Sequence, residues 1–177
     1  NLHKTWKFDG LLIDPYNSLA KDPAVLRSVG GHEYDYQIAS EMRLFSKEYD
    51  VSIWLNAHAV TEALRKKHPS GHEFEGLPQP CSMADVEGGG KWGNRADDVI
   101  STHRYTQHPT RWMVSDIHVV KVKETETGGR PTSLDAPISL RMQPSNVAFT
   151  VAGRDIINHS KPLPTMKVPN QSPKLAF

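Results

Sequence analysis

The sequence is poor in the features that mark secreted and membrane proteins. It has a single cysteine, Cys81, so it can form neither an internal disulfide nor a metal site built from several cysteines. It contains no run of about 18 apolar residues, which a membrane-spanning helix needs. Its start lacks the charged and then apolar pattern of a secretion leader. We therefore expect a cytoplasmic protein that is not secreted and has no membrane partner.

An excess of charge of either sign is also missing. The chain has 21 Lys and Arg against 20 Asp and Glu, a net charge of +1, which excludes a strongly basic nucleic-acid binder but not a local basic patch. Its 177 residues favour one domain. From Ser160 onward four prolines occur in 18 residues, which is typical of an extended tail. We expect a domain over residues 1–159 and a proline-rich tail or linker over 160–177.

The first half of the sequence predicts strands that alternate with helices. Residues 10–14 form a short continuous apolar run, which is typical of a strand buried on both faces of a parallel sheet. Residues 18–33 contain Asp22-Pro23 and Gly30-Gly31 and predict a loop with at most one helical turn. An apolar stripe at helical spacing then predicts a helix over 33–49: Tyr34, Ile38, Met42, Phe45 and Tyr49. A second strand over 51–55, a short helix over 60–67 and a long loop over 68–90 follow.

The second half predicts mainly strands. We expect a short helix at 92–96 and strands at 98–104, 112–124, 138–142 and 147–151, with a turn at Gly128-Gly129. Strands joined by helices pair in parallel, and strands joined by short turns pair antiparallel. The expected fold is therefore α/β, with a parallel sheet that carries antiparallel edge strands.

Two polar side chains follow the first two predicted strands. Asp14 ends the first strand, and His58 comes just after the second. Because ligands of open α/β sheets bind outside the carboxyl ends of the strands, both side chains would face one crevice, where an Asp can help to hold magnesium. Each residue also has a simpler interpretation, Asp14 as the cap of the next turn and His58 as a structural histidine.

These segments resemble the RecA-like motor of ring-shaped replicative DNA helicases, above all the phage-type primase-helicases, their mitochondrial relative Twinkle and the DnaB-like enzymes. In that family a Walker B strand ends in Asp, often followed by Pro-Tyr-Asn, as in residues 11–17 here. An amphipathic helix and a strand with a His or Gln after it come next, as in residues 33–58. Residues 80–89 and 96–104 resemble two later family segments, and the likeness covers about residues 8–151.

The resemblance implies a P-loop NTPase that binds ATP or another NTP with Mg²⁺ and moves along single-stranded DNA as a ring, expected to be a hexamer. It implies that Asp14 holds magnesium through water and that His58 senses the γ-phosphate. Lys121 and Lys123 fall where the family has Lys-x-Arg, whose cations reach the neighbouring subunit's nucleotide. Lysine lacks the two-pronged geometry of arginine, so Arg104 or Arg130 are alternatives for that role. Solvated lysines at a sheet edge are the simpler interpretation of Lys121 and Lys123.

The resemblance also places a DNA-contacting loop just past His58. Three adjacent cations lie there, Arg65, Lys66 and Lys67, and could bind phosphates without base preference, with Phe74 as a stacking residue. The same cations could simply offset the dipole of a helix terminus. His68 and His72 do not form a metal pair in our interpretation, because Pro69 and Gly71 break helical geometry and no third ligand is evident.

The phosphate-binding loop, Gly-x-x-x-x-Gly-Lys-Ser/Thr, is absent, and Gly88-Gly89-Gly90-Lys91 lacks its spacing. In the resembling family this loop and a catalytic Glu precede the Walker B strand, and the present chain begins with Asn1 rather than Met. We therefore expect the chain to be the later part of an NTP-dependent helicase, inactive alone, from a bacterial, phage-infected or mobile-element setting. The alternatives are a RecA- or plasmid-replication-type ATPase, and a non-catalytic nucleic-acid-binding module with a decayed nucleotide site.

Overall fold

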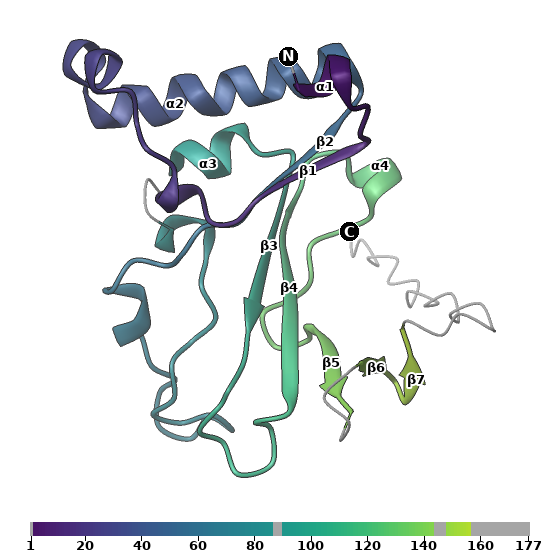
Figure 1. Cartoon of the computed structure of the whole chain (residues 1–177). Coiled ribbons are helices and arrows are strands. Elements are labelled where there is room, and N and C mark those ends of the chain that lie inside the picture. The colour runs from purple at the N-terminus through teal and green to yellow at the C-terminus, as the bar shows by residue number, and fades with distance from the viewer. Residues whose placement is uncertain (1, 87–89, 144–147, 157–177) are drawn as a thin grey trace, which may run out of the picture.

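The computed structural model describes residues 2–86, 90–143 and 148–156. The tail over 160–177 lies outside the described residues. Within the described residues, three single turns of 3₁₀-helix occur, at Tyr16–Ser18, Ala63–Arg65 and Met83–Asp85. The helices and strands shown in Figure 1 are α1 (Leu2–Thr5), β1 (Gly10–Ile13), α2 (Pro23–Tyr49), β2 (Ser52–Leu55), α3 (Gly90–Arg95), β3 (Asp98–His103), β4 (Val114–Val122), α4 (Thr125–Gly128), β5 (Ile138–Met142), β6 (Phe149–Val151) and β7 (Arg154–Asp155).

The mixed α/β class is confirmed, and so is the parallel pairing at its start. β1 and β2 pair in parallel, with Leu11 opposite Ile53 and Ile13 opposite Leu55. Helix α2 provides the crossover between them and packs against β2. The predicted apolar stripe of α2 is half-buried along its length. At its far end Phe45 and Tyr49 pack with the buried ring of His3.

Helix α2 begins ten residues earlier than the sequence patterns predicted. Asp22 caps its start, since the carboxylate Oδ1 accepts hydrogen bonds from the backbone N–H groups of Ala24 (2.8 Å) and Val25 (3.3 Å), and Pro23 occupies the first helical position. This Asp-Pro pair is a helix start signal rather than a loop signal. The two halves of α2 meet at a kink, where Gly30 adopts φ 80°, a left-handed conformation that favours glycine.

The prediction that the first strand is buried on both faces was wrong. Leu12 and Trp54 lie opposite each other on β1 and β2, and they are 65% and 58% exposed. The alternate residues of both strands are half-buried. Within the described residues, therefore, this short sheet is covered on one face only.

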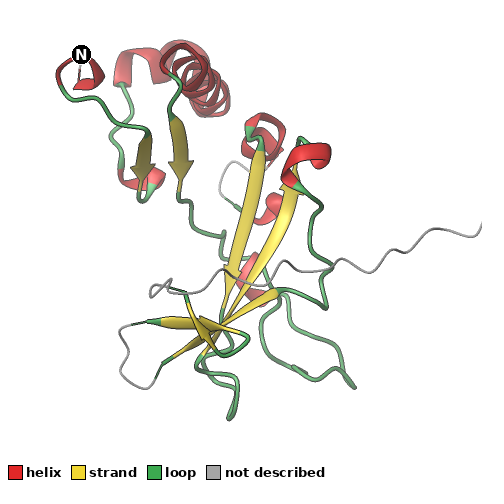
Figure 2. Ribbon diagram, turned by 90° about the vertical axis from the view of Figure 1, so that its right-hand side faces the viewer, coloured by secondary structure: helices red, strands yellow, loops and turns green. Residues whose placement is uncertain are grey.

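The strands of the second half form a separate sheet. Its order is β3-β4-β5-β6-β7, and every neighbouring pair is antiparallel, so the predicted antiparallel strands are confirmed. The single mixed sheet that we expected is not seen in the described residues, because β3 pairs with β4 and not with β2. Figure 2 shows the two short parallel strands beside the longer strands of the second sheet.

Contacts from α2 tie the second sheet to the first. Arg43 of α2 forms an ion pair with Asp97, the residue before β3, at 3.2 Å. The guanidinium of Arg95, in α3, lies 4.2 Å from the centre of the Tyr36 ring. Helix α3 packs beneath α2 (Figure 1). These contacts hold α3 and the start of β3 against α2.

Candidate functional site

Asp14 and Asn56 meet at the carboxyl ends of the parallel strands. Each directly follows its strand, and the side-chain Nδ2 of Asn56 donates a 2.5 Å hydrogen bond to Oδ1 of Asp14. The backbone continues this junction, since the N–H of Asn56 donates to the carbonyl of Ile13 and the N–H of Tyr16 donates to the carbonyl of Asn56. Both polar side chains are exposed. The parallel pairing therefore presents the Asp14 carboxylate to solvent at a fixed position.

His58 lies two residues beyond Asn56, past the same end of the sheet as Asp14. Its side chain is exposed. Among the described residues its ring forms no hydrogen bond, ion pair or ring contact. Both residues predicted to face one crevice are therefore at the same end of the two-stranded sheet.

The Asp14 carboxylate could bind Mg²⁺ only if water and phosphate oxygens supplied the rest of its coordination shell. Oδ1 of Asp14 is engaged by Asn56, which leaves Oδ2 without a partner among the described residues. In phosphate-transfer sites Mg²⁺ keeps several waters and takes one or two carboxylates, and substrate phosphates complete its shell. No group of three or more His, Cys, Asp or Glu side chains in the described residues could hold a metal ion by itself. Asp14 fits the magnesium role, but only with water and phosphate ligands.

A cluster of charged side chains lies next to this junction. Asp35 of α2 accepts a 2.8 Å hydrogen bond from the Tyr16 hydroxyl and forms ion pairs with Lys21 (2.8 Å) and Lys91 (3.3 Å). The ring of Trp92 packs edge-on against Tyr16. Burial and the neighbouring Asp35 carboxylate raise the pKa of Tyr16. The pKa of Asp35 is lowered, because hydrogen bonds from Lys21, Tyr16 and Lys91 outweigh its burial. We call Tyr16, Lys21, Asp35 and Lys91 the Asp35 cluster; no spacing in the sequence indicates it.

Lys121 is engaged within its own chain. Its ammonium donates hydrogen bonds to the backbone carbonyls of Gly93 (2.7 Å) and Ala96 (2.6 Å), at the end of α3. The last carbonyls of a helix have no partner in the helix, and a cation near them is favourable. In this structure, therefore, Lys121 fastens α3 to β4.

The other three predicted cations differ in how freely they can act. Lys123 forms an ion pair with Asp97 at 2.9 Å, and the same carboxylate also forms an ion pair with Arg43. Arg104 uses its Nε to bond the backbone carbonyl of Trp112 at 2.5 Å. Arg130 is exposed after α4 and has no side-chain partner among the described residues. Of these three, Arg130 is the most available to a neighbouring molecule.

The predicted basic triplet is divided by the structure. Lys66 forms an ion pair with the buried Asp85, whose carboxylate also accepts hydrogen bonds from the backbone and hydroxyl of Ser82. The hydrogen bond from Lys66 and those from Ser82 lower the pKa of Asp85 to about 2. Arg65 and Lys67 are exposed and lack side-chain partners among the described residues. Two of the three cations therefore remain available to phosphates.

His68 and His72 come together despite the proline and glycine between them. Their rings stack with centroids 4.1 Å apart, and Nε2 of His68 lies 2.9 Å from the hydroxyl of Tyr105. Tyr105 in turn stacks on Phe74 at 3.9 Å. Phe74 is therefore committed to internal packing.

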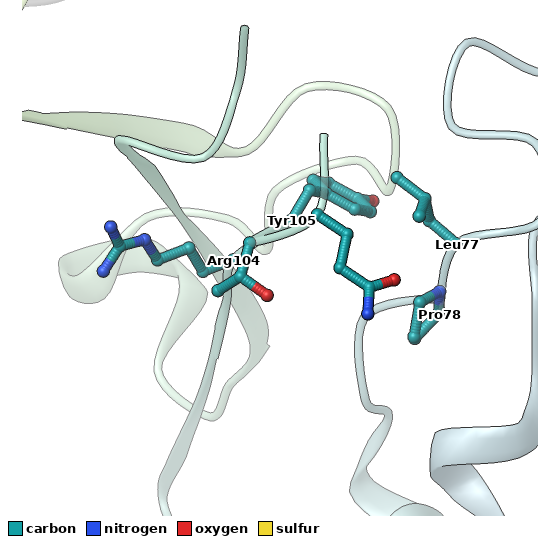
Figure 3. A pocket seen from close by; sticks show the side chains of 6 residues that line it. Leu77, Pro78, Arg104 and Tyr105 are labelled. Atoms are coloured by element: carbon teal, nitrogen blue, oxygen red, sulfur yellow. The ribbon is translucent and has the colours of Figure 1, made fainter. Parts of the chain in front are cut away.

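A cavity of about 140 Å³ is lined by Leu77, Pro78 and residues 104–107. Figure 3 shows the Arg104 side chain extending away from Tyr105 and Leu77.

Two further histidines lie on the adjoining sheet face. His103 and His118 are on β3 and β4, and neither ring nitrogen of the buried His118 has a partner among the described residues. Asp116, which is only 2% exposed, is held by Arg111 and by the hydroxyl of Ser139. We call His68, His72, His103 and His118 the histidine cluster. Because its members come from a loop and two strands, spacing in the sequence gave no signal for it.

Comparison with known proteins adds no family to this geometry. No protein-family model matches the sequence, and no match is found among curated proteins. Among the described residues, no helix has both the length and the apolar character that crossing a membrane requires.

Proposed function

We propose that the chain belongs to the motor of an NTP-dependent DNA helicase of the ring-forming, RecA-like type. The observation that carries the proposal is the junction of Asp14 and Asn56 at the carboxyl ends of two parallel strands. This end of a parallel α/β sheet is where ligands bind, and an acid there can share a magnesium ion with nucleotide phosphates. The order of the motifs along the sequence, described above, supports the same assignment.

The proposal gives each element of the site a role. Asp14 would hold Mg²⁺ through water, and His58, which follows the neighbouring strand, would sense the γ-phosphate. Asn56 fixes the orientation of the Asp14 carboxylate. The NTP, bound with Mg²⁺, would supply the phosphoryl group whose transfer to water drives movement along single-stranded DNA.

In a ring, a cation from one subunit would complete the site of the next. Lys121 and Lys123 are both engaged with their own chain. We therefore assign the trans-acting role to Arg130, which is exposed and carries the guanidinium that suits a transferring phosphoryl group. Arg65 and Lys67 would contact the DNA backbone, while Lys66 supports the loop through Asp85.

Open strand edges in both sheets are consistent with a RecA-like core. Within the described residues β2 pairs only with β1, and β3 pairs only with β4. An unpaired strand edge is a template for a further strand. Under the proposal, a segment that carries the phosphate-binding loop would supply such a strand.

The test is NTP hydrolysis by the full-length protein, measured with Mg²⁺ in the presence and absence of single-stranded DNA. The proposal predicts hydrolysis that DNA stimulates and that Arg130→Ala abolishes in the assembled protein. A matched control is Arg27→Ala, which removes an exposed arginine from the first half of α2. Absence of hydrolysis, with DNA still bound, would instead favour the nucleic-acid-binding module with a decayed nucleotide site.

A further inference from the structure

The loop over residues 68–77 is closed at its base. The backbone N–H of His68 donates to the carbonyl of Leu77 at 2.9 Å, and one step further out the N–H of Gln79 donates to the carbonyl of Lys66 at 2.8 Å. Compact surface loops whose ends meet in this way are frequently functional. The 68–77 loop is therefore a unit that can move about a fixed base.

Ring contacts attach this loop to the end of β3. Phe74 stacks on Tyr105 with ring centroids 3.9 Å apart, and Nε2 of His68 lies 2.9 Å from the Tyr105 hydroxyl. His72 stacks on His68, and His103 of β3 packs edge-on against Tyr105 at 4.5 Å. Tyr105 is only 5% exposed. Tyr105 is thus the point where the loop and the second sheet meet.

Two histidines of the cluster lie on the sheet itself, without partners for their ring nitrogens. His118 lies opposite Ser101, and His103 lies opposite Asp116. His118 is 6% exposed, and neither of its ring nitrogens has a partner among the described residues; the same holds for Nε2 of His103. A protonated imidazole carries two N–H donors. Protonation of the closed structure would therefore bury a charged group without hydrogen bonds, which is costly.

The charged groups around the cluster offer little compensation for added positive charge. Asp116 attracts a proton on His103 or His118, but its carboxylate already forms an ion pair with Arg111 at 2.8 Å and accepts a hydrogen bond from Ser139 at 2.6 Å. The other titratable groups that face the rings of the cluster, of Tyr105 or of Phe74 are Glu73 of the loop, His108 in the turn after β3, and Asp135 before β5.

The rings should bind protons more readily once the loop has opened. Burial lowers the pKa of His68, His103 and His118 below the ordinary value of 6.5, and the neighbouring His72 lowers that of His68 further. In an open loop the same rings meet water and titrate closer to 6.5. Each histidine that takes up a proton on opening shifts the equilibrium toward the open form by up to about tenfold per pH unit below that value.

We propose that the histidine cluster is a pH-sensitive latch, which keeps the 68–77 loop closed on the second sheet at neutral pH and releases it at mild acidity. Release would expose Tyr105 and widen the cavity between it and Leu77 and Pro78, which lie across from Tyr105 in Figure 3. The opening is local, since α2 and the parallel strands make no part of the latch. The latch does not rest on the proposed function and goes beyond it.

The experiment is hydroxyl-radical footprinting of the full chain at about pH 7.5 and about pH 5.5, with oxidation of single side chains measured by mass spectrometry. Tyr105 reports opening of the loop. Tyr16 is the internal control, because it is also buried but packs against Trp92 and Asp35, outside the cluster. We expect oxidation of Tyr105 to rise by about fivefold or more at the lower pH, while that of Tyr16 stays the same.

Histidine variants connect the response to the latch. His118→Leu and His68→Phe each remove a titrating ring and keep an apolar or aromatic side chain in its place, so each should weaken the pH response of Tyr105, and the double variant should nearly abolish it. His58→Leu removes an exposed histidine outside the cluster and should respond like the wild type. Protection of Tyr16 shows that a variant is folded. If His118→Leu does not fold, His68→Phe still decides the matter.

Three outcomes would overturn the latch. Tyr105 could stay equally protected at both pH values in the wild type. Tyr105 and Tyr16 could lose protection together, which would show unfolding of the whole chain instead of a local opening. The double variant could respond to pH as strongly as His58→Leu, which would assign the response to groups outside the cluster.

Discussion

The Asn56 side chain holds the Asp14 carboxylate by a 2.5 Å hydrogen bond across two parallel strands, although the two residues lie 42 positions apart in the sequence. The bond joins the first residue after β1 to the first residue after β2. The geometry of the candidate site therefore depends on the parallel pairing, because any shift of register between the strands would separate the two side chains.

Removing the Asn56 amide should loosen this junction without unfolding the protein. Asn56→Ala deletes one exposed hydrogen bond to a carboxylate, and we expect a loss of about 1 kcal/mol in the free energy of unfolding. Urea denaturation monitored by circular dichroism measures the change. Ser52→Ala, an exposed position on the same strand, is the control and should change the stability little. Equal stability of Asn56→Ala and wild type would show that the bond does not contribute to the fold.

Lys121 should matter more for stability than Lys123. Lys121→Met leaves two backbone carbonyls at the end of α3 without their donor, and charged hydrogen bonds of this kind contribute about 1.5–3 kcal/mol. Lys123→Met removes an ion pair in which both partners are more than a third exposed, a type that contributes at most about 1 kcal/mol. Chemical unfolding of the two variants side by side tests the order. A larger loss in Lys123→Met would contradict the capping role assigned to Lys121.

Asp85 should make the protein sensitive to strong acid and to loss of the carboxylate charge. Its pKa in the folded chain is about 2, against 3.8 for an ordinary Asp, chiefly because Lys66 and Ser82 donate hydrogen bonds to it. Its contribution is therefore complete above pH 3.8 and is lost as the pH falls toward 2. Asp85→Asn should cost about 1–3 kcal/mol at neutral pH. In this variant the decline in stability between these two pH values should be smaller than in the wild type.

The histidine cluster should add a second loss of stability at mild acidity. Burial lowers the pKa of His68, His103 and His118 below the usual 6.5. The folded chain therefore binds fewer protons than the unfolded chain, and stability is full above pH 6.5 and falls as the pH drops below it. Urea midpoints measured at neutral pH and at about pH 5 report this change.

His118→Leu is the variant that isolates this effect. Neither nitrogen of the His118 ring has a partner among the described residues, so an apolar side chain sacrifices no hydrogen bond there. We expect its stability to fall less steeply below pH 6.5 than that of the wild type. His58→Leu removes an exposed histidine outside the cluster and serves as the comparison. An unchanged pH dependence in His118→Leu would mean that His118 does not titrate differently in the folded and unfolded chain.

Local patterns in the sequence predicted the elements well where periodicity decides the structure. The stripe from Tyr34 to Tyr49 forms one side of a helix, and the run over 10–14 forms a strand in parallel pairing. The placement of Asp14 and His58 at one end of that sheet follows from the same pattern. The start of α2 was missed because Asp22-Pro23 was interpreted as a turn, whereas the carboxylate caps the helix.

Contacts between distant segments could not be predicted in this way. The Asp35 cluster gathers side chains from positions 16, 21, 35 and 91, and no spacing rule connects them. The partners of Lys121 are backbone carbonyls, which carry no signature in the sequence. The two sheets are separate because β3 pairs with β4 and not with β2. A strand has the same sequence pattern whether or not its edge is paired, so this separation could not be predicted.

The most direct test of the proposed function is the rate of DNA-stimulated NTP hydrolysis by the full-length protein with Asp14→Ala compared with Asp9→Ala. The two exposed aspartates flank the same strand, Asp9 before it and Asp14 after it, so they match in type and setting but not in the end of the sheet they occupy. We predict that Asp14→Ala lowers the rate by about 100-fold or more, as expected for loss of a magnesium-orienting group, while Asp9→Ala leaves it near that of the wild type. Near-normal hydrolysis by a folded Asp14→Ala protein would contradict the account.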